Sequence, residues 1–268
     1  MENYKKQLEE SYSNIFNIDR NNPEWAVKKK TKKENIHPAI PFVGNFYENT
    51  KILLYASAEN LTYYEEKQGD NWLDDDYYAI NRRKISNGHF FPHIHIAPIN
   101  DGSLLIVAAY ILNKWNINLN YSTPYEFIEN VAIDNFCKFS LKTSEKDRKN
   151  KDYAKDINKL KFSFDYIKSD LEILQPNILA LPKTIYGHDE VKKMIKEILP
   201  NCLILPIYQI NSSTINRIIA KKYDKKGKEE IPETLLKWQK NLSNGITGKT
   251  NLNFYSIYNY IDSLFENK

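Results

Sequence analysis

The chain has 268 residues, of which 41% are hydrophobic and 27% are charged, and its formal net charge is +4. This length accommodates one large α/β domain or two small ones, and the composition is that of an ordinary globular protein. No apolar run approaches the roughly 18 residues of a membrane span, and the first residues contain no apolar signal region, so we expect a cytoplasmic protein without a membrane partner. The mild basic excess permits nucleic acid as a partner without requiring it.

The amino-terminal region, residues 1–45, is predicted to form a helix followed by a basic arm. Leu8 and Tyr12 belong to a set of apolar residues that recur at helical spacing within residues 3–17. Residues 28–33 read Lys-Lys-Lys-Thr-Lys-Lys, the densest positive run of the chain. Such a run is either a solvated linker or an arm that contacts phosphate.

Four short apolar runs predict strands that are buried on both faces, because their apolar residues are continuous rather than alternating. These runs are residues 51–56, 131–133, 177–181 and 202–207. Helical periodicity predicts helices between them at residues 103–115, 157–174 and 189–199, and a helical tail at residues 232–268. Strands that alternate with helices over short links indicate a parallel sheet covered by helices on both faces, which we expect to form a single domain over residues 1–268.

The most informative stretch is the end of the second of these strands. Asp134 and Asn135 follow the apolar run and so belong at the carboxyl end of a strand, where ligands bind in an open α/β sheet. The planar amide of Asn135 offers both a donor and an acceptor, the pattern needed to read the edge of a base. Lys138, three residues later, can meet a phosphate. The alternative is a buried strand that ends in a capping Asp or Asn before a basic loop.

A segment between the first two strands combines phenylalanines with histidines. Phe90 and Phe91 can stack on a base. His93 and His95 alternate along one face of an extended segment, a spacing that can ligate a metal. No third ligand stands out in the sequence, so we predict no metal and no cofactor.

The two cysteines, Cys137 and Cys202, are too few for an iron–sulfur cluster or a four-cysteine zinc site. Both lie in apolar runs that predict strands. We therefore expect two buried thiols in a reducing compartment.

The four strand ends together resemble the uracil-DNA glycosylase superfamily, over about residues 52–217. Residues 56–60, which read Ala-Ser-Ala-Glu-Asn, resemble the loop that follows the first strand of that superfamily. Asn135 and Lys138 match its base-reading Asn and the Lys three positions later. Two further segments resemble its Leu-x-Pro strand and its last strand with a His-Pro-Ser loop; they are residues 172–181 and 204–213.

This resemblance implies a three-layer α/β/α sandwich around a four-stranded parallel sheet, with DNA as the partner. The chain departs from the pattern at several positions. Ala56 and Asn60 replace two glycines, and Glu59 replaces a proline. Ala58 stands where some branches carry a catalytic Asp or Asn, and Gln209 stands where the His of His-Pro-Ser is expected.

The resemblance also implies roles for particular residues in cleaving an N-glycosidic bond. Glu59 or Asp134 would stabilise the positive charge on the sugar or orient a water molecule. Gln209, as a weaker and neutral donor, would take the place of the missing His. The substrate itself would be bound by polar and aromatic residues near the strand ends, namely Asn135, Phe90, Phe91, Asn60, Lys138 and Asn211.

We therefore predict a monomeric DNA glycosylase that excises a flipped pyrimidine, either uracil or a modified cytosine of the kind found in phage DNA. The inserted residues 71–92 contain polar side chains, among them Arg82, Arg83 and His89, which favour a bulky polar base as an antiviral-defence enzyme would require. One alternative is a non-catalytic DNA-binding module of the same fold. Another is a metal-dependent hydrolase built on His93 and His95.

Overall fold

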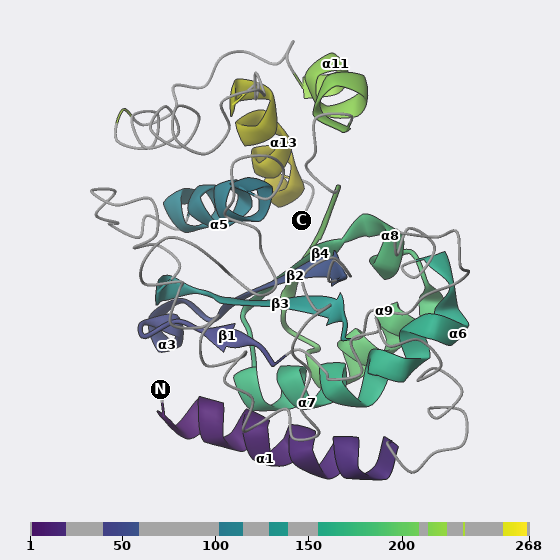
Figure 1. Cartoon of the computed structure of the whole chain (residues 1–268). Helices are drawn as coiled ribbons and strands as arrows, with labels where there is room; N and C mark the ends of the chain where they lie inside the picture. Colours follow the sequence, from purple (N-terminus) through teal and green to yellow (C-terminus); the bar gives the residue numbers. More distant parts are fainter. Residues whose placement is uncertain are drawn as a thin grey trace, which may run out of the picture.

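A five-stranded sheet forms the centre of the computed structural model, with the strand order β1-β3-β2-β4-β5 (Figure 1). The strands are β1 (Phe42–Val43), β2 (Ile52–Ala58), β3 (Ala132–Cys137), β4 (Ile178–Pro182) and β5 (Leu203–Ile207). The structure describes residues 2–19, 40–58, 102–114, 129–138, 155–208, 214–223, 233 and 254–266.

The four strands predicted from the sequence are all present and run parallel to one another. β2 pairs with β3 and β4, and β4 pairs with β5. The expected sheet was nevertheless incomplete, because β1 adds a fifth strand that pairs antiparallel with β3, with Phe42 opposite Ile133. The sequence does not predict β1, since a two-residue strand beside Pro41 and Gly44 is too short to show a periodic pattern. The sheet is therefore mixed rather than purely parallel.

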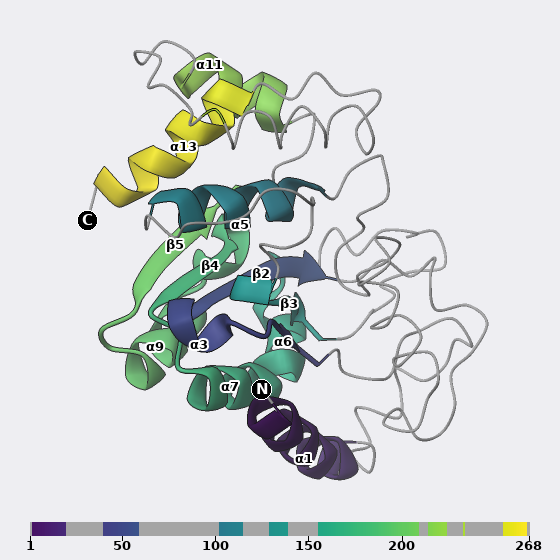
Figure 2. The same ribbon diagram turned by 90° about the vertical axis from the view of Figure 1, so that its left-hand side faces the viewer.

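Helices cover both faces of the sheet (Figures 1 and 2). One face carries α1 (Glu2–Asp19), α7 (Phe164–Leu174) and α9 (Asp189–Ile198), and the other carries α5 (Gly102–Lys114) and α13 (Phe254–Glu266). Shorter helical segments are α3 (Tyr47–Thr50), α6 (Ile157–Leu160), η4 (Lys161–Ser163), α8 (Lys183–Tyr186), the π-helical η5 (Ile215–Ile219) and α11 (Ala220–Tyr223). The predicted helices at residues 3–17, 103–115, 157–174 and 189–199 are confirmed, although the third is built of three consecutive pieces. In the described part of the chain, no helix is both long and apolar enough to cross a bilayer.

The strand side chains alternate between two apolar cores. On β2, Ile52 and Leu54 contact the layer of α5 and α13, whereas Leu53 and Tyr55 contact the layer of α1 and α7. All four are fully buried. Burial on both faces explains why the sequence of this strand is continuously apolar, as it is in β4.

The connections place the carboxyl ends of the four parallel strands at one edge of the sheet. The chain passes from β2 outward to β3 by way of α5, and then returns past β2 to β4 by way of α7, on the opposite face. This change of face at a reversal of direction is what right-handed crossovers require. The reversal lies between β2 and β4, which is the point where open α/β sheets bind their ligands. We call this side of the sheet the carboxyl edge.

The close approach of β1 to the start of β3 depends on Gly44. Its backbone N–H donates to the carbonyl of Val131 at 3.0 Å, and a Cβ on Gly44 would lie 2.4 Å from the carbonyl carbon of Glu129.

Because backbone atoms cannot give way as a flexible side chain can, we expect Gly44→Ala to lower the free energy of unfolding by about 1–3 kcal/mol. Urea titration would measure this. Gly187→Ala is the matched control: its Cβ would lie 3.4 Å from the nearest atoms, and we expect a change within about 0.5 kcal/mol. Equal losses in the two variants would contradict the assigned role of Gly44.

Candidate functional site at the carboxyl edge of the sheet

Three of the predicted site residues lie at the carboxyl end of β3 in the structure. Asp134 and Asn135 belong to the strand, and Lys138 follows its last residue. The other predicted site residues lie outside the described residues; they are Glu59, Asn60, Phe90, Phe91, Gln209 and Asn211, together with His93, His95 and the basic run 28–33. In the chain, Glu59 directly follows β2 and Gln209 comes two residues after β5, so the sequence still connects both to the carboxyl edge.

Lys138 is completely buried between two carboxylates. Its ammonium group donates to Oδ2 of Asp134 and, at 2.6 Å, to Oδ2 of Asp170 on α7. All three side chains have no solvent-exposed surface. The backbone N–H of Lys138 also donates to Ser163 Oγ at 2.9 Å. These bonds tie the end of β3 to the helical layer beneath it.

Two buried tyrosines complete this arrangement. The hydroxyl of Tyr12 on α1 donates to Asp170 Oδ1 at 2.7 Å, and that of Tyr55 on β2 donates to Asp170 Oδ2 at 2.8 Å. The two rings also lie 5.3 and 5.5 Å from the Lys138 ammonium, within the range of a cation–π contact. We call Tyr12, Tyr55, Asp134, Lys138 and Asp170 the buried ionic cluster. It connects α1, β2, the end of β3 and α7 through hydrogen bonds, ion pairs and cation–π contacts.

Burial shifts the pKa of three members of this cluster, Asp170, Tyr12 and Tyr55. Desolvation raises the pKa of Asp170 above its ordinary 3.8, and the Lys138 ammonium and the two tyrosine hydroxyls oppose that rise. Desolvation also raises the pKa of Tyr12 and Tyr55 well above their ordinary value, so both remain neutral hydrogen-bond donors. The cluster thus places one ammonium group between two carboxyl groups where water cannot screen them.

The cluster changes what the predicted residues can do. Asp134 Oδ1 accepts the backbone N–H of Asn135 at 2.7 Å, and its Oδ2 accepts the Lys138 ammonium, so both oxygens are engaged inside the protein. Lys138 lies in the interior rather than on a surface that faces a phosphate. The arrangement favours a positioning role for both residues.

Asn135 points to the other side of the sheet. Successive strand residues face opposite ways, so Asp134 faces α7 and Asn135 faces the layer of α5. Asn135 is fully buried and lies in register with Ala56 of β2, whose side chain is small. The backbone N–H bond to Asp134 fixes the strand at this point. A planar amide is thus held by a rigid backbone at the end of a central pair of strands.

Asp170, Tyr12 and Tyr55 were not predicted from the sequence as members of the site. A signal for Asp170 exists, because it follows Tyr166 by four residues and precedes Leu174 by four, which places a carboxylate on the apolar stripe of an amphipathic helix. A buried carboxylate requires a partner. The two tyrosines gave no comparable signal, since a tyrosine on a buried face normally packs as an apolar ring.

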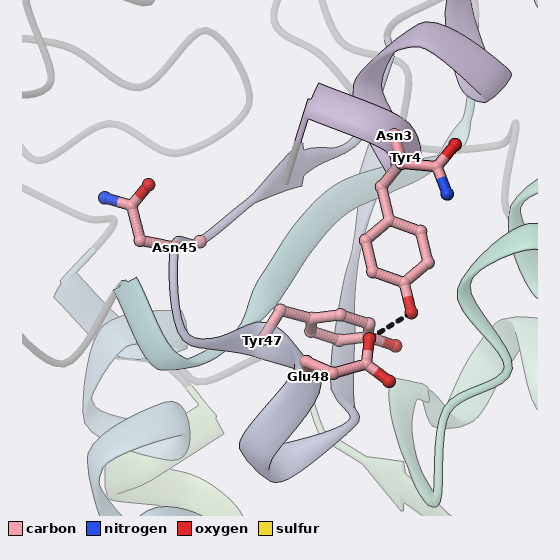
Figure 3. A pocket seen from close by; sticks show the side chains of 6 residues that line it. Asn3, Tyr4, Asn45, Tyr47 and Glu48 are labelled. Atoms are coloured by element: carbon pink, nitrogen blue, oxygen red, sulfur yellow. Dashed lines mark hydrogen bonds between the residues drawn. The ribbon is translucent and has the colours of Figure 1, made fainter.

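A pocket of about 380 Å³ lies away from this edge, beside β1 and the start of α1 (Figure 3). It is lined by Asn3, Tyr4, Gly44, Asn45, Tyr47 and Glu48. The Tyr4 hydroxyl donates to Glu48 and accepts from the Lys51 ammonium at 2.5 Å, so three of the polar groups here bind one another. Desolvation raises the pKa of Tyr4, which keeps it a donor. None of the lining residues belongs to the predicted site, so the pocket is separate from it.

Among the described residues, no group of three His, Cys, Asp or Glu side chains is arranged to hold a metal ion. Cys137 and Cys202 are free thiols. The expectation of burial is confirmed for Cys137, whereas Cys202 is only half-buried.

Comparison of the chain with protein-family models, curated proteins and solved structures finds no match.

The buried ionic cluster predicts a large effect of removing its one cation. Lys138→Met leaves two carboxyl groups buried without a counter-charge, and we expect it to lower the free energy of unfolding by about 3–5 kcal/mol at neutral pH. Without the ammonium, the folded protein holds protons on these carboxyls at a higher pH than the unfolded chain does. The loss should therefore shrink as the pH is lowered from neutral to about pH 5, which urea titrations at several pH values would measure.

A double variant separates lost charge balance from lost packing. Lys138→Met/Asp170→Asn removes one of the two unbalanced carboxylates, so it should be more stable than Lys138→Met alone. Lys192→Met, in an exposed ion pair with Asp189, is the control and should hardly change stability. The single variant Asp170→Asn completes the comparison. If the losses in the free energy of unfolding caused by Lys138→Met and Asp170→Asn simply add in the double variant, then Lys138, Asp134 and Asp170 do not act as a charge-balanced unit.

Proposed function

We propose that this protein is a DNA glycosylase of the uracil-DNA glycosylase type, which hydrolyses the N-glycosidic bond of a flipped pyrimidine and leaves an abasic site. One observation carries the proposal: Asn135 lies at the carboxyl end of β3, beside β2 and next to the reversal of strand direction. This is where an open α/β sheet offers a ligand its most convergent set of loops. The four mutually parallel strands occupy the segments on which the resemblance rests.

The rigidity of the Asn135 backbone supports a role in base recognition. A flipped base is recognised through hydrogen bonds to its edge, and these bonds discriminate only when the protein group cannot move to suit another base. Asn135 belongs to a fully buried strand, and its neighbour Asp134 is fixed by Lys138. We assign Asp134 and Lys138 to positioning Asn135.

This assignment leaves the chemistry to the residues that follow β2 and β5. Glu59 would stabilise the developing positive charge on the sugar or orient the attacking water. Gln209, with Asn211, would donate to the departing base. A carboxylate is well suited to the first task, because the transition state of glycoside cleavage is cationic at the sugar.

A second candidate function is a DNA-binding module that binds a flipped base without releasing it. It is favoured by the engagement of both Asp134 oxygens inside the protein. At the described ends of β2 and β3, Asp134 is the one carboxylate present. Under this candidate, Asn135 still reads a base, but Glu59 does not act as a catalyst.

The proposal predicts that Asn135→Ala loses base release. Losing a paired base edge removes about 1–3 kcal/mol of recognition, so kcat/KM should fall about 5- to 150-fold or more. Abasic sites would be measured by alkaline cleavage of oligonucleotides that carry uracil, hydroxymethylcytosine or its glucosylated form, and we expect preference for the larger polar bases. Asn201→Ala, in an exposed turn, is the matched control. Unchanged activity in Asn135→Ala would exclude Asn135 as the base-reading residue.

The same assay separates the two candidate functions through Glu59→Gln. A glycosylase would lose base release in this variant while DNA binding persists. A binding module would release no base even as the unaltered protein, while Asn135→Ala would weaken its binding.

A further inference from the structure

The exposed cations of the described chain differ in whether they have acidic partners. Every lysine on α1, α7 and α9 except Lys196 pairs with an acid about one turn away among the described residues, as in Lys5–Glu9, Lys168–Asp165 and Lys193–Glu197. Such pairs neutralise their own charge and need no external anion.

Four exposed cations around the end of β5 form no such pair. They are Lys183, Arg217, Lys221 and Lys222, and we call them the basic edge. Among the described residues none of the four lies within 4.0 Å of a carboxylate. α8 begins directly after β4 and contacts β5, whereas η5 and α11 follow β5 in the chain and contact α13.

A row of tyrosines joins the two ends of the basic edge. The Lys183 ammonium lies 4.9 Å from the centre of the Tyr208 ring and 3.3 Å from its hydroxyl. Tyr208 contacts Tyr260 with ring centres 5.5 Å apart, Tyr260 contacts Tyr223 at 5.1 Å, and the Lys222 ammonium lies 5.3 Å from the Tyr223 ring. The Tyr260 hydroxyl also accepts the backbone N–H of Tyr208 at 2.8 Å. These contacts fix α8, the end of β5, α13 and α11 relative to one another.

Acidic residues near this edge already have a role. Asp189 and Glu190 lie in the first turn of α9, where a negative charge stabilises the amino-terminal end of a helix. Asp189 also pairs with Lys192. Neither lies within 4.0 Å of any of the four cations, and on α13 Asp262 pairs with Lys114 instead.

We propose that the basic edge binds the phosphate backbone of DNA. The inference rests on the proposed function, because the strand whose nucleotide reaches Asn135 must pass along the carboxyl edge. Clustered cations without counter-charges attract a polyanion and release its condensed counterions. The tyrosine row contacts two of these cations, Lys183 and Lys222, and so limits the conformational freedom that they would lose on binding DNA.

The test compares two variants with the same change in net charge. Lys183→Gln/Arg217→Gln/Lys221→Gln/Lys222→Gln removes four positive charges at the basic edge. Lys5→Gln/Lys6→Gln/Lys193→Gln/Lys196→Gln removes four from exposed positions on α1 and α9. Fluorescence anisotropy with unmodified single-stranded and duplex oligonucleotides, between about 50 and 200 mM salt, would give the slope of log affinity against log salt.

We expect the edge variant to bind DNA at least about tenfold more weakly at the lower salt concentrations, with a slope shallower by about 3. The control variant should stay close to the unaltered protein. Equal loss in the two variants would overturn the proposal, since net charge alone would then explain binding. Stronger binding of the unaltered protein to phosphatidylserine vesicles than to DNA would overturn it as well.

The outcomes distinguish this inference from the proposed function. If the protein releases a base but the edge variant binds DNA as the control variant does, the proposed function is supported and the basic edge is not the phosphate-binding surface. If only the edge variant loses DNA binding and the unaltered protein releases no base, the DNA-binding role of the basic edge is supported and the proposed glycosylase function is rejected. A thermal unfolding midpoint within a few degrees of the unaltered protein is required of both variants.

Discussion

One buried ammonium group, that of Lys138, holds together the elements on which the candidate site depends. Because its side chain has no solvent-exposed surface, its charge requires partners inside the protein, and Asp134 of β3 and Asp170 of α7 provide them. Asp170 in turn requires its own donors, which Tyr12 and Tyr55 supply from α1 and β2. Each partner can satisfy the next only in one relative placement of four elements. The cluster therefore adds a directional constraint to the apolar packing of the helical layer on the sheet, and this constraint holds the end of β3 in place.

The sequence predicted the framework better than it predicted the site. Burial on both faces leaves continuous apolar runs, so the four parallel strands could be located, whereas the two-residue β1 has too few residues for any period. Asp134, Asn135 and Lys138 could be placed at the end of a strand, but the direction of the Lys138 side chain could not. A lysine after a strand normally faces solvent, and the partner that holds this one inside, Asp170, lies 32 residues further along the chain.

The two sides of the carboxyl edge use charge in different ways. At the end of β3, opposite charges are buried together and stabilise one geometry. Around the end of β5, like charges remain exposed and are supported by aromatic rings. A site that reads a base while holding a polyanion needs both properties, because base recognition depends on rigidity and phosphate binding depends on uncompensated charge. The distribution of charge in the fold is thus consistent with one ligand contacting both sides.

The span of the buried ionic cluster along the chain affects the order in which the protein can fold. Tyr12 and Asp170 are separated by 158 positions, and Tyr55 and Asp170 by 115. During synthesis, α1, β2 and β3 leave the ribosome before α7 does, and the Lys138 ammonium then lacks one of its two carboxylates. Burying it at that stage is unfavourable, so we expect β2 and β3 to remain solvated until residue 170 has emerged. Under this expectation the sheet assembles late and cooperatively, once α7 and β4 are available.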